Sequence, residues 1–334
     1  MKTMKAYLTR TYGPEARFEK AEIPVPQPAS GQILIEVKAT SLNPIDHMFL
    51  RQNLGFNPEL PAVLHSDVAG IVSAVGQGVS GFQTGDEVYA CAGGFKGHGG
   101  ALADFMVADA RLVAHKPRTL DFASAAALPL VALTAWEGLI DSADVQPGQH
   151  VLIHGGTGGV GHVALQLAKS KGARVATTIS SEEKAKIVRD LGADEIINYR
   201  EQSVEQYVQT LTGGKGFDIV FDTIGGKNLD HSFTATRNRG QVINILAFAS
   251  HDLTPAILRS LTLHIENMSI PLLTGEGREK QGEILRQIAA LVDDGKLKPL
   301  IHEQRFSFDQ VNEAHALYET KRHTGKIVLI RTSP

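Results

Sequence analysis

The chain has 334 residues, enough for about two domains of ordinary size. Its 33 lysines and arginines nearly balance 36 aspartates and glutamates, which argues against a nucleic-acid partner, because binding phosphates requires a basic face. Hydrophobic residues make up 43% of the chain, which supports a sizeable core and excludes general disorder. The single cysteine, Cys91, excludes an intramolecular disulfide and a four-cysteine zinc lobe, and we expect it to be buried.

Neither a signal peptide nor a membrane-spanning helix is predicted. Charged residues interrupt the first ten positions, and no run approaches the roughly 18 apolar residues that a spanning helix needs. The alanine-rich stretch 122–140 contains Pro129, Trp136 and Glu137, which favours a packed segment. We therefore expect a cytoplasmic protein with a reduced thiol and no membrane partner.

The first third of the chain is predicted to form strands and turns. Apolar runs with alternation at residues 32–38, 68–75 and 86–90 are typical of strands. A glycine-rich loop follows at 93–100 and carries Phe95, Lys96 and His98. This part is predicted to be an all-β unit, and its glycine loop is either a cap over a substrate cleft or a surface loop.

From about residue 124 the pattern changes to alternating strands and helices. The expected strands are 151–154, 174–179, 195–199, 218–221, 241–246 and 262–266, and the expected helices between them include 159–171, 182–191 and 204–211. Six strands with helical crossovers predict an α/β fold with a doubly wound parallel sheet. The C-terminal part predicts helices at 280–294 and 310–319 and strands at 304–308 and 326–330.

A glycine-rich turn follows the strand 151–154 and opens the next helix. The turn matches the dinucleotide fingerprint G-x-G-x-x-G in its expected context. Its first glycine permits a tight turn, its second lets a pyrophosphate approach the backbone, and its third lets the helix pack closely on the strand. The helix N-terminus adds unpaired N–H donors. We interpret it as a dinucleotide site rather than an ordinary turn. The residues expected to contact the cofactor are Gly156, Thr157, Gly158, Gly159, Val160 and Gly161.

The end of the second strand distinguishes NADPH from NADH. An NAD site places an acidic residue about 20 positions after the turn, where it binds the ribose 2′-hydroxyl. Ser180 stands at that place and Ser181 follows it, so no carboxylate repels a 2′-phosphate. Lys184 and the hydroxyl of Tyr199 are expected within reach, which favours NADPH, although two glutamates follow Ser181. A surface role for Lys184 and Tyr199 is the alternative.

The fifth strand of the sheet also predicts cofactor contacts. Ligands of open α/β sheets bind beyond the carboxyl ends of the strands. We therefore expect the backbone of Leu246, Ala247 and Phe248 to contact the nicotinamide.

An ordered set of motifs runs through the whole chain. It comprises residues 24–28 (Pro-Val-Pro-Gln-Pro), 43–46 (Asn-Pro-Ile-Asp), 61–70, 85–88, 100–104, 133–136 (Leu-Thr-Ala-Trp), the glycine turn, 197–199 and 325–328 (Gly-Lys-Ile-Val). The set resembles the zinc-free quinone oxidoreductase branch of the medium-chain dehydrogenase/reductase superfamily. The resemblance implies a GroES-like β domain at 1–123, completed by 269–334, and a Rossmann domain with a six-stranded sheet at 124–268. It further implies a homodimer or homotetramer paired through about 262–269, and a cofactor contact from Lys326.

The resemblance also bears on zinc. Alcohol dehydrogenases of this superfamily bind catalytic zinc with a Cys/His/Cys set, and those positions match Asn43, His65 and Leu130. Only the histidine is a ligand type, whereas a catalytic zinc needs three protein ligands. We therefore expect no tight zinc site and interpret His65 as a hydrogen-bonded cleft histidine.

Without a Lewis acid, oxidation of an unactivated alcohol is difficult. A conjugated acceptor is easier to reduce, because it spreads the developing charge and hydrogen bonds can stabilise it. The resemblance implies NADPH-dependent reduction of a small electrophilic acceptor, a quinone or an α,β-unsaturated carbonyl. Quinones, alkenals, enoyl thioesters and haloacrylates are not separated by the sequence.

Four further residues are candidates for the catalytic cleft. The resemblance places Asn43 and Asp46 beside the nicotinamide ribose and Thr134 near the nicotinamide. Asn43 is also suited to an Asx turn before a helix that starts at proline. Where several relatives have a tyrosine, this chain has Met48, which cannot donate a proton. His47 is able to protonate an enolate, and the alternative is a surface position with water or the ribose hydroxyl as donor.

Two other functions stay open at this point. One is a zinc-dependent alcohol or aldehyde dehydrogenase, which stoichiometric zinc in the purified protein would favour. The other is a non-catalytic NADPH-binding redox sensor, which tight cofactor binding without turnover would favour.

Overall fold

The computed structural model describes residues 2–332 and divides into two compact units. Unit 1 comprises residues 1–130 and 269–334, and unit 2 comprises residues 131–268. The sequence analysis places the first boundary at residue 123 instead. The difference arises because the short helix α2 (Phe122–Ala126) packs against strands of unit 1.

Unit 1 is built on two mainly antiparallel sheets. Its strands are β1 (Thr3–Thr9), β2 (Glu19–Pro24), β3 (Gln32–Ser41), β4 (Ala62–Val63), β5 (Asp67–Val75), β6 (Glu87–Cys91), β7 (Phe105–Asp109), β8 (Val113–His115), β15 (Phe306–Ser307) and β16 (Val328–Ile330). The smaller sheet has the order β2-β1-β4, and the larger has the order β15-β16-β3-β5-β6-β8, with β7 also paired to β3. Because β16 pairs with the end of β3, the C-terminal segment completes this unit.

Helices cover the sheets of unit 1. Besides α2 they are α1 (Pro44–Arg51), α9 (Ile270–Thr274), α10 (Arg278–Asp293) and α11 (Val311–Glu319), with 3-10 turns η1 (Ala110–Leu112) and η3 (Phe308–Gln310). Helix α1 starts where Pro44 supplies a preset φ at the first helical position and the Asp46 carboxylate accepts from the Asn43 N–H at 2.8 Å. Helix α10 buries an apolar stripe against β8 and η1.

Unit 2 contains the six-stranded parallel sheet expected from the sequence. Its strands are β9 (His150–Ile153), β10 (Arg174–Ile179), β11 (Glu195–Asn198), β12 (Phe217–Asp222), β13 (Thr236–Asn244) and β14 (Thr262–Ile265), in the order β11-β10-β9-β12-β13-β14. Its helices are α3 (Pro129–Trp136, whose first two residues belong to unit 1), α4 (Gly159–Ser170), α5 (Glu182–Asp190), α6 (Val204–Thr212), α7 (Asn228–Ala235) and α8 (Thr254–Leu258), with the π-helix η2 (Glu137–Ser142).

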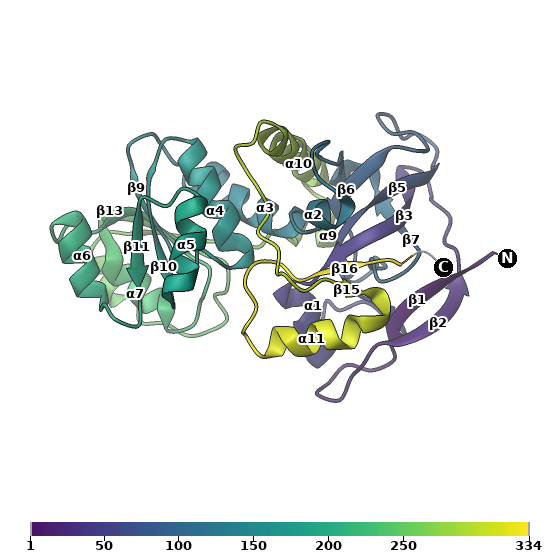
Figure 1. Ribbon diagram of the computed structural model, residues 1–334, viewed down its shortest axis with the longest axis horizontal. Coiled ribbons are helices and arrows are strands. Elements are labelled where there is room, and N and C mark those ends of the chain that lie inside the picture. Colours follow the sequence, from purple (N-terminus) through teal and green to yellow (C-terminus); the bar gives the residue numbers. More distant parts are fainter. Residues whose placement is uncertain (1, 333–334) are drawn as a thin grey trace. The chain divides into compact units, whose positions relative to one another are not determined.

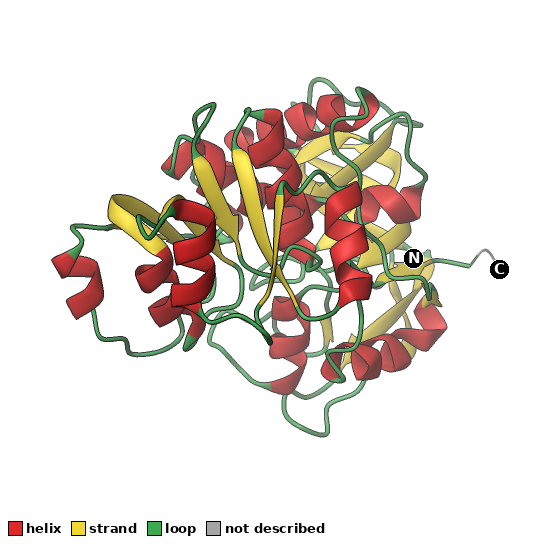
Figure 2. Ribbon diagram, turned by 60° about the vertical axis from the view of Figure 1, so that its left-hand side comes forward, coloured by secondary structure: helices red, strands yellow, loops and turns green. Residues whose placement is uncertain are grey.

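The strand order fixes where a ligand of this sheet would bind. Figure 1 shows α4 and α5 on one side of the strands and α6 and α7 on the other, and Figure 2 shows helices flanking the sheet. Because both faces are covered, the strands are continuous apolar runs such as Val151–Ile153. The strand order reverses beside β9, and the glycine turn follows β9 directly. The turn therefore lies at the topological switch point, where doubly wound sheets bind their ligands.

Candidate functional site

Two glycines of the turn after β9 leave no room for a side chain. A Cβ at Gly156 would meet the Thr177 hydroxyl at 2.2 Å, and a Cβ at Gly161 would meet the carbonyl oxygen of Gly155 at 2.1 Å. Gly158 stands at the N-terminus of α4, where the first N–H groups have no partner within the helix. This geometry fits the pyrophosphate of a dinucleotide.

The carboxyl ends of β10 and β11 lie side by side. The Tyr199 N–H donates to the carbonyl of Ile179 at 3.2 Å, so Tyr199 follows the end of β11 next to Ser180. Ser181 caps α5 by accepting from the Lys184 N–H. The next residue in the chain, Arg200, is exposed and, besides Lys184, is the second cationic residue that follows the end of β10 or β11. The sequence analysis missed Arg200, because only the register of β11 beside β10 brings it there.

The segment after β13 is tied to the sheet edge by a buried hydrogen-bond network. The Leu246 N–H donates to the Asn244 side chain at 2.9 Å, and that side chain donates to Asp222 at 3.1 Å. Phe248, two residues further, is 75% exposed. Thr134, by contrast, is buried within α3. The two hydrogen bonds hold Leu246–Phe248 at the same strand ends as the glycine turn, where a cofactor-binding segment is expected.

In unit 1, a buried polar cluster surrounds the start of α1. We call Asn43, Asp46, Ser66, Asp67 and Lys326 the Asn43 cluster, and all five are buried. The Asn43 side chain donates to Asp67 at 2.8 Å, and its carbonyl oxygen accepts a hydrogen bond from the Lys326 ammonium. The same ammonium lies 3.5 Å from the Asp67 carboxylate. The cluster thus contains a hydrogen-bonded ion pair that is enclosed by protein. Removing either charge would leave the other buried without a partner, which strongly lowers the free energy of unfolding.

Burial changes the acidity of this cluster. Burial raises the pKa of Asp46 to about 7, and the N–H groups of Asn43 and Ser66 oppose that shift. Burial also lowers the pKa of Lys326, while the carboxylates of Asp67 and Asp46 raise it. Asp46 is therefore able to change charge near neutral pH.

The sequence analysis matched His65 to a zinc-ligand position together with Asn43, but in the structure another side chain lies beside Asn43. The side chain beside Asn43 belongs to Ser66, whose hydroxyl lies 3.4 Å from the Asn43 amide nitrogen. The ring of His65 instead contacts Thr40 and His315, at 3.4 Å and 3.0 Å. The left-handed backbone of His65, with φ +72°, accompanies this placement.

His47 belongs to the same group of imidazoles as His65. Its Nδ1 lies 3.2 Å from Nδ1 of His315, and its Nε2 lies 3.3 Å from the carboxylate of Glu319. The sequence analysis missed His315, because this residue is 268 positions from His47 and carries no motif. Burial lowers the pKa of His65 to about 3 and that of His315 well below its usual value. Burial and then Arg51 lower the pKa of His47.

The glycine-rich loop 93–100 is anchored by an aromatic residue. Phe95 is fully buried and packs edge-on against Phe49, with ring centroids 5.2 Å apart. Lys96 is exposed, and His98 is half-buried beside Arg278. Cys91, just before the loop, is buried as expected. The loop is therefore fixed at its aromatic side chain and open only at its tip.

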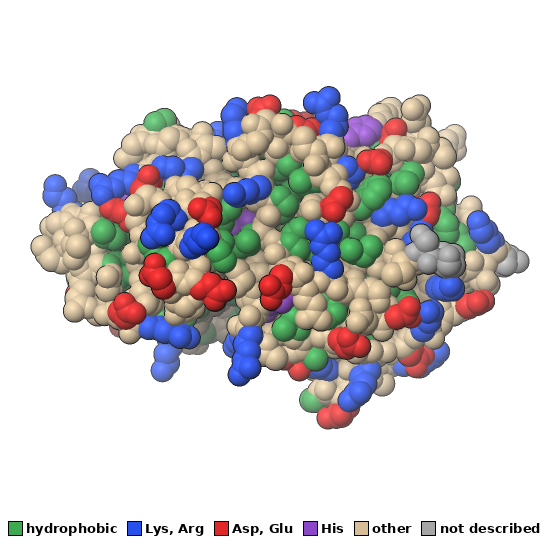
Figure 3. Space-filling model, in the orientation of Figure 1, with side chains coloured by type: hydrophobic (Ala, Val, Ile, Leu, Met, Phe, Trp, Pro, Cys, Tyr) green, Lys and Arg blue, Asp and Glu red, His purple; other side chains and the backbone are tan. Residues whose placement is uncertain are grey.

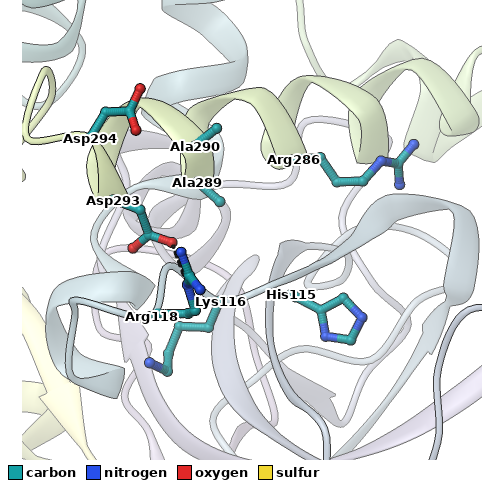
Figure 4. A pocket seen from close by; sticks show the side chains of 8 residues that line it. All are labelled: His115, Lys116, Arg118, Arg286, Ala289, Ala290, Asp293 and Asp294. Atoms are coloured by element: carbon teal, nitrogen blue, oxygen red, sulfur yellow. Dashed lines mark hydrogen bonds and ion pairs between the residues drawn. The ribbon is translucent and has the colours of Figure 1, made fainter.

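A cavity of about 360 Å³ in unit 1 lies between β8 and α10 and is shown in Figure 4. Its lining residues are His115, Lys116, Arg118, Arg286, Ala289, Ala290, Asp293 and Asp294. None of them is a predicted site residue. Arg118 is paired with Asp293 and Lys116 with Glu87, at 3.4 Å and 3.1 Å, so the cations of this cavity are already balanced.

Three general properties of the described residues bear on partners. Between residues 2 and 332, no group of three or more His, Cys, Asp or Glu side chains is arranged to hold a metal ion. In that range no helix combines the length and apolarity needed to cross a bilayer. On the face shown in Figure 3, basic and acidic side chains are interspersed rather than gathered by sign.

Comparison with known proteins gives matches along the chain. Residues 29–118 match the alcohol dehydrogenase GroES-like domain, and residues 191–329 match the zinc-binding dehydrogenase family. A quinone oxidoreductase of Rattus norvegicus is 32% identical over 319 residues, which cover 95% of this chain and 94% of that protein. A chloroplastic NADPH-dependent alkenal/one oxidoreductase of Arabidopsis thaliana is 32% identical, over 98% of this chain and 80% of that protein.

A solved structure agrees with these matches. An alcohol dehydrogenase superfamily protein from Novosphingobium aromaticivorans superposes with a TM-score of 0.93 at 40% identity, covering 98% of this chain and 100% of that one. Unit 1 is thus a GroES-like domain, and the parallel sheet of unit 2 is of the Rossmann type. The chain belongs to the medium-chain dehydrogenase/reductase superfamily, in its quinone oxidoreductase branch.

Proposed function

We propose that the chain is an NADPH-dependent oxidoreductase that transfers a hydride to a quinone or an α,β-unsaturated carbonyl without catalytic zinc. The observation that carries the proposal is the hydrogen bond from Lys326 to Asn43. It puts an ammonium group against Asn43, the residue that the resemblance matches to a zinc ligand of alcohol dehydrogenases.

The donor set around Asn43 does not fit zinc. The Asn43 oxygen already accepts from Lys326, and its nitrogen donates to Asp67. The Leu130 side chain has no atom that can bind a metal, and its backbone N–H donates to Asp67 at 2.8 Å. A divalent cation here would face the Lys326 ammonium in a medium of low dielectric constant, where like charges repel strongly. Zinc also requires three protein ligands, and these residues do not supply them.

The residues of unit 2 fit NADPH. The glycine turn leaves room and N–H donors for the pyrophosphate. We place Ser180, Ser181, Lys184, Tyr199 and Arg200 at the 2′-phosphate, because they follow the ends of β10 and β11 and offer hydroxyls and cations, including a guanidinium suited to a phosphate. The alkenal/one oxidoreductase relative, named as NADPH-dependent, supports the same cofactor.

In this mechanism the protein binds, orients and excludes water. NADPH, when bound, supplies the hydride. We place Asn43 and Asp46 at the nicotinamide ribose, Thr134 and Leu246–Phe248 at the nicotinamide, and Met48 in the wall of an apolar acceptor site. Holding the nicotinamide against an electron-poor carbon lowers the barrier, because the reactants are already oriented. Lys326 acts through Asn43, by fixing its side chain.

An acceptor panel tests the proposal. Oxidation of NADPH and NADH is measured with 1,4-benzoquinone, but-3-en-2-one, an enoyl thioester, a haloacrylate and a saturated aldehyde, before and after chelation of metals. We expect turnover with NADPH and a conjugated acceptor, unchanged by chelation. Stoichiometric zinc and loss of activity on chelation would establish a zinc-dependent dehydrogenase instead. Tight NADPH binding without turnover would establish a redox sensor.

We also propose a homodimer or homotetramer that pairs through β14. This strand is at the edge of the parallel sheet, and Ile265 at its end is 55% exposed. An unpaired edge with an exposed apolar side chain favours pairing with a second copy. Light scattering should give a mass of two or four chains, and Ile265→Lys should lower it. A monomeric wild-type protein would refute this part.

A further inference from the structure

Three histidines of unit 1 form a continuous hydrogen-bonded chain that no motif indicated. We call His47, His315 and His65 the histidine chain. It begins at Glu319, whose carboxylate lies 3.3 Å from Nε2 of His47, and continues from Nδ1 of His47 to Nδ1 of His315 at 3.2 Å. From Nε2 of His315 it reaches Nε2 of His65 at 3.0 Å. Figure 1 shows that the two helices involved, α1 and α11, lie near one another.

The inner end of the histidine chain sets the direction of every hydrogen bond in it. The Thr40 hydroxyl donates to the carbonyl of Asp67 at 2.5 Å, so it can only accept from Nδ1 of His65, 3.4 Å away. A neutral imidazole has one donor and one acceptor nitrogen. With Nδ1 of His65 as donor, its Nε2 accepts from His315.

The same reasoning extends outward. His315 donates through Nε2, so its Nδ1 accepts from Nδ1–H of His47. The neutral form of His47 therefore carries its proton on Nδ1, and its Nε2 is the free basic nitrogen. A further proton on the chain can bind only there, beside Glu319.

The surroundings favour His47 as the group that exchanges protons. His65 and His315 are buried, whereas the His47 side chain is 13% exposed. The groups that face His47 are Glu319, Arg51, the ring of Tyr318 and His315; Arg51 also binds Glu319 at 2.7 Å. The carboxylate of Glu319 stabilises a protonated Nε2, and Arg51 keeps that carboxylate in place.

We propose that His47 supplies, through Nε2, the proton consumed in the reduction, and that His315 and His65 are positioning residues that hold His47 in the required tautomer. The proposal rests on the proposed function. The proposed function puts Asp46 at the nicotinamide ribose and Met48 in the wall of the acceptor site, and His47 stands between these two residues in α1. Of His47 and Met48, only His47 can donate a proton.

The step balances for an α,β-unsaturated carbonyl. The hydride and its two electrons form a C–H bond at the β-carbon, and the π electrons of the double bond move to give an enolate. The Nε2–H bond of the His47 imidazolium then breaks, its electrons stay on nitrogen, and the proton bonds to the α-carbon. Water returns a proton to Nε2, so one NADPH and one solvent proton are consumed per turnover.

Four single-residue variants of this chain test the proposal. His315→Leu removes the acceptor for His47, and His315→Asn keeps an oxygen acceptor close to the position of Nδ1. His47→Gln removes the donor. Phe18→Leu is the matched control, because Phe18 packs against His315 with ring centroids 4.9 Å apart and its side chain makes no hydrogen bond to the histidine chain.

The first measurement is independent of turnover. The ¹⁵N chemical shifts of labelled histidines report which ring nitrogen carries the proton. We expect neutral His47 to be protonated on Nδ1 in the wild type, in His315→Asn and in Phe18→Leu, and on Nε2 in His315→Leu. An Nε2–H tautomer in the wild-type protein would overturn the assignment.

The second measurement is the pH dependence of kcat with NADPH and but-3-en-2-one. We expect kcat to fall as the pH rises through the pKa of His47, because the protonated form is the donor. His47→Gln should lower kcat on the order of 10²-fold and abolish that fall. His315→Leu should lower kcat with the KM for NADPH unchanged, and His315→Asn should restore it. If His47→Gln keeps the wild-type kcat and pH profile, the donor role is refuted and the proposed function stands. If the wild-type protein shows no turnover with any acceptor, the donor role and the proposed function are both refuted. The NMR measurement would still decide the tautomer of His47 in that case.

Discussion

Lys326 donates a hydrogen bond to the side chain of Asn43 across 283 positions of sequence. This contact joins the C-terminal segment to the start of α1 and holds a positive charge inside unit 1 beside Asp67. Because the charge is buried and paired, we expect this contact to contribute to the stability of unit 1.

Removing the ammonium of Lys326 should destabilise the fold strongly. Lys326→Met leaves the buried carboxylate of Asp67 without its cation, and breaking a buried pair costs about 3–5 kcal/mol. Urea denaturation measures this change in the free energy of unfolding. Lys296→Met is the control, because the pair of Lys296 with Asp294 is exposed and should contribute less than about 1 kcal/mol. Equal effects of the two substitutions would contradict the prediction.

Gly161 of the glycine turn should not tolerate an added methyl group. Gly161→Ala places a Cβ 2.1 Å from the carbonyl oxygen of Gly155, so α4 must shift away from β9. We expect a loss of about 1–3 kcal/mol in stability and weaker NADPH binding, measured by thermal unfolding and fluorescence titration. Gly99→Ala is the control, because a Cβ there meets no atom within 4 Å and its backbone is not left-handed. Unchanged NADPH affinity in Gly161→Ala would remove the turn from the cofactor site.

Cofactor preference should depend on the cations at the ends of β10 and β11. Lys184→Ala and Arg200→Ala should each weaken NADPH binding about tenfold or more and leave NADH binding unchanged, because only NADPH has the 2′-phosphate. Exposed Lys186 on the same helix provides the control variant Lys186→Ala. Titration of both nucleotides with each variant checks this, and equal losses for NADPH and NADH would exclude a phosphate contact.

Stability should fall in acid because of His65. Burial lowers the pKa of His65 to about 3 in the folded protein, against about 6.5 when unfolded. Between these values the unfolded state binds the extra proton, so the contribution of neutral His65 is present above pH 6.5 and is lost as the pH falls toward 3. Relative to His65→Asn, which tolerates the left-handed backbone, the wild type should lose roughly 1.4 kcal/mol per pH unit over this range.

Asp46 should act in the opposite direction. Its folded pKa is raised to about 7, so the folded state holds a proton that the unfolded state has lost above about pH 4. Its contribution to stability is present below pH 4 and is lost as the pH rises through 7. The comparison of the wild type with His65→Asn isolates the effect of the histidine, because Asp46 is present in both proteins. If the difference in the free energy of unfolding between these two proteins does not depend on pH, the prediction for His65 is contradicted.

Local sequence patterns were sufficient to predict the parallel sheet of unit 2. Residues 151–171 contain an apolar strand, a glycine turn and a helix with apolar spacing, and each pattern is complete within a few residues. Repetition of this unit predicts a parallel sheet, because short crossovers have a fixed hand. The six strands of the structure confirm that prediction. Arg200 was missed, because only the register of β11 beside β10 brings the residues after β11 to the end of β10.

The sequence by itself determined the family, the order of strands and helices and the glycine turn, because these depend on residues close together in the chain. Only the tertiary structure decided which side chains meet in unit 1. It put Ser66 rather than His65 beside Asn43, and it brought His315 to His47 across 268 positions. The first arrangement accompanies the left-handed backbone of His65, and the second depends on the packing of α11 against α1. Neither feature leaves a periodic signal in the sequence.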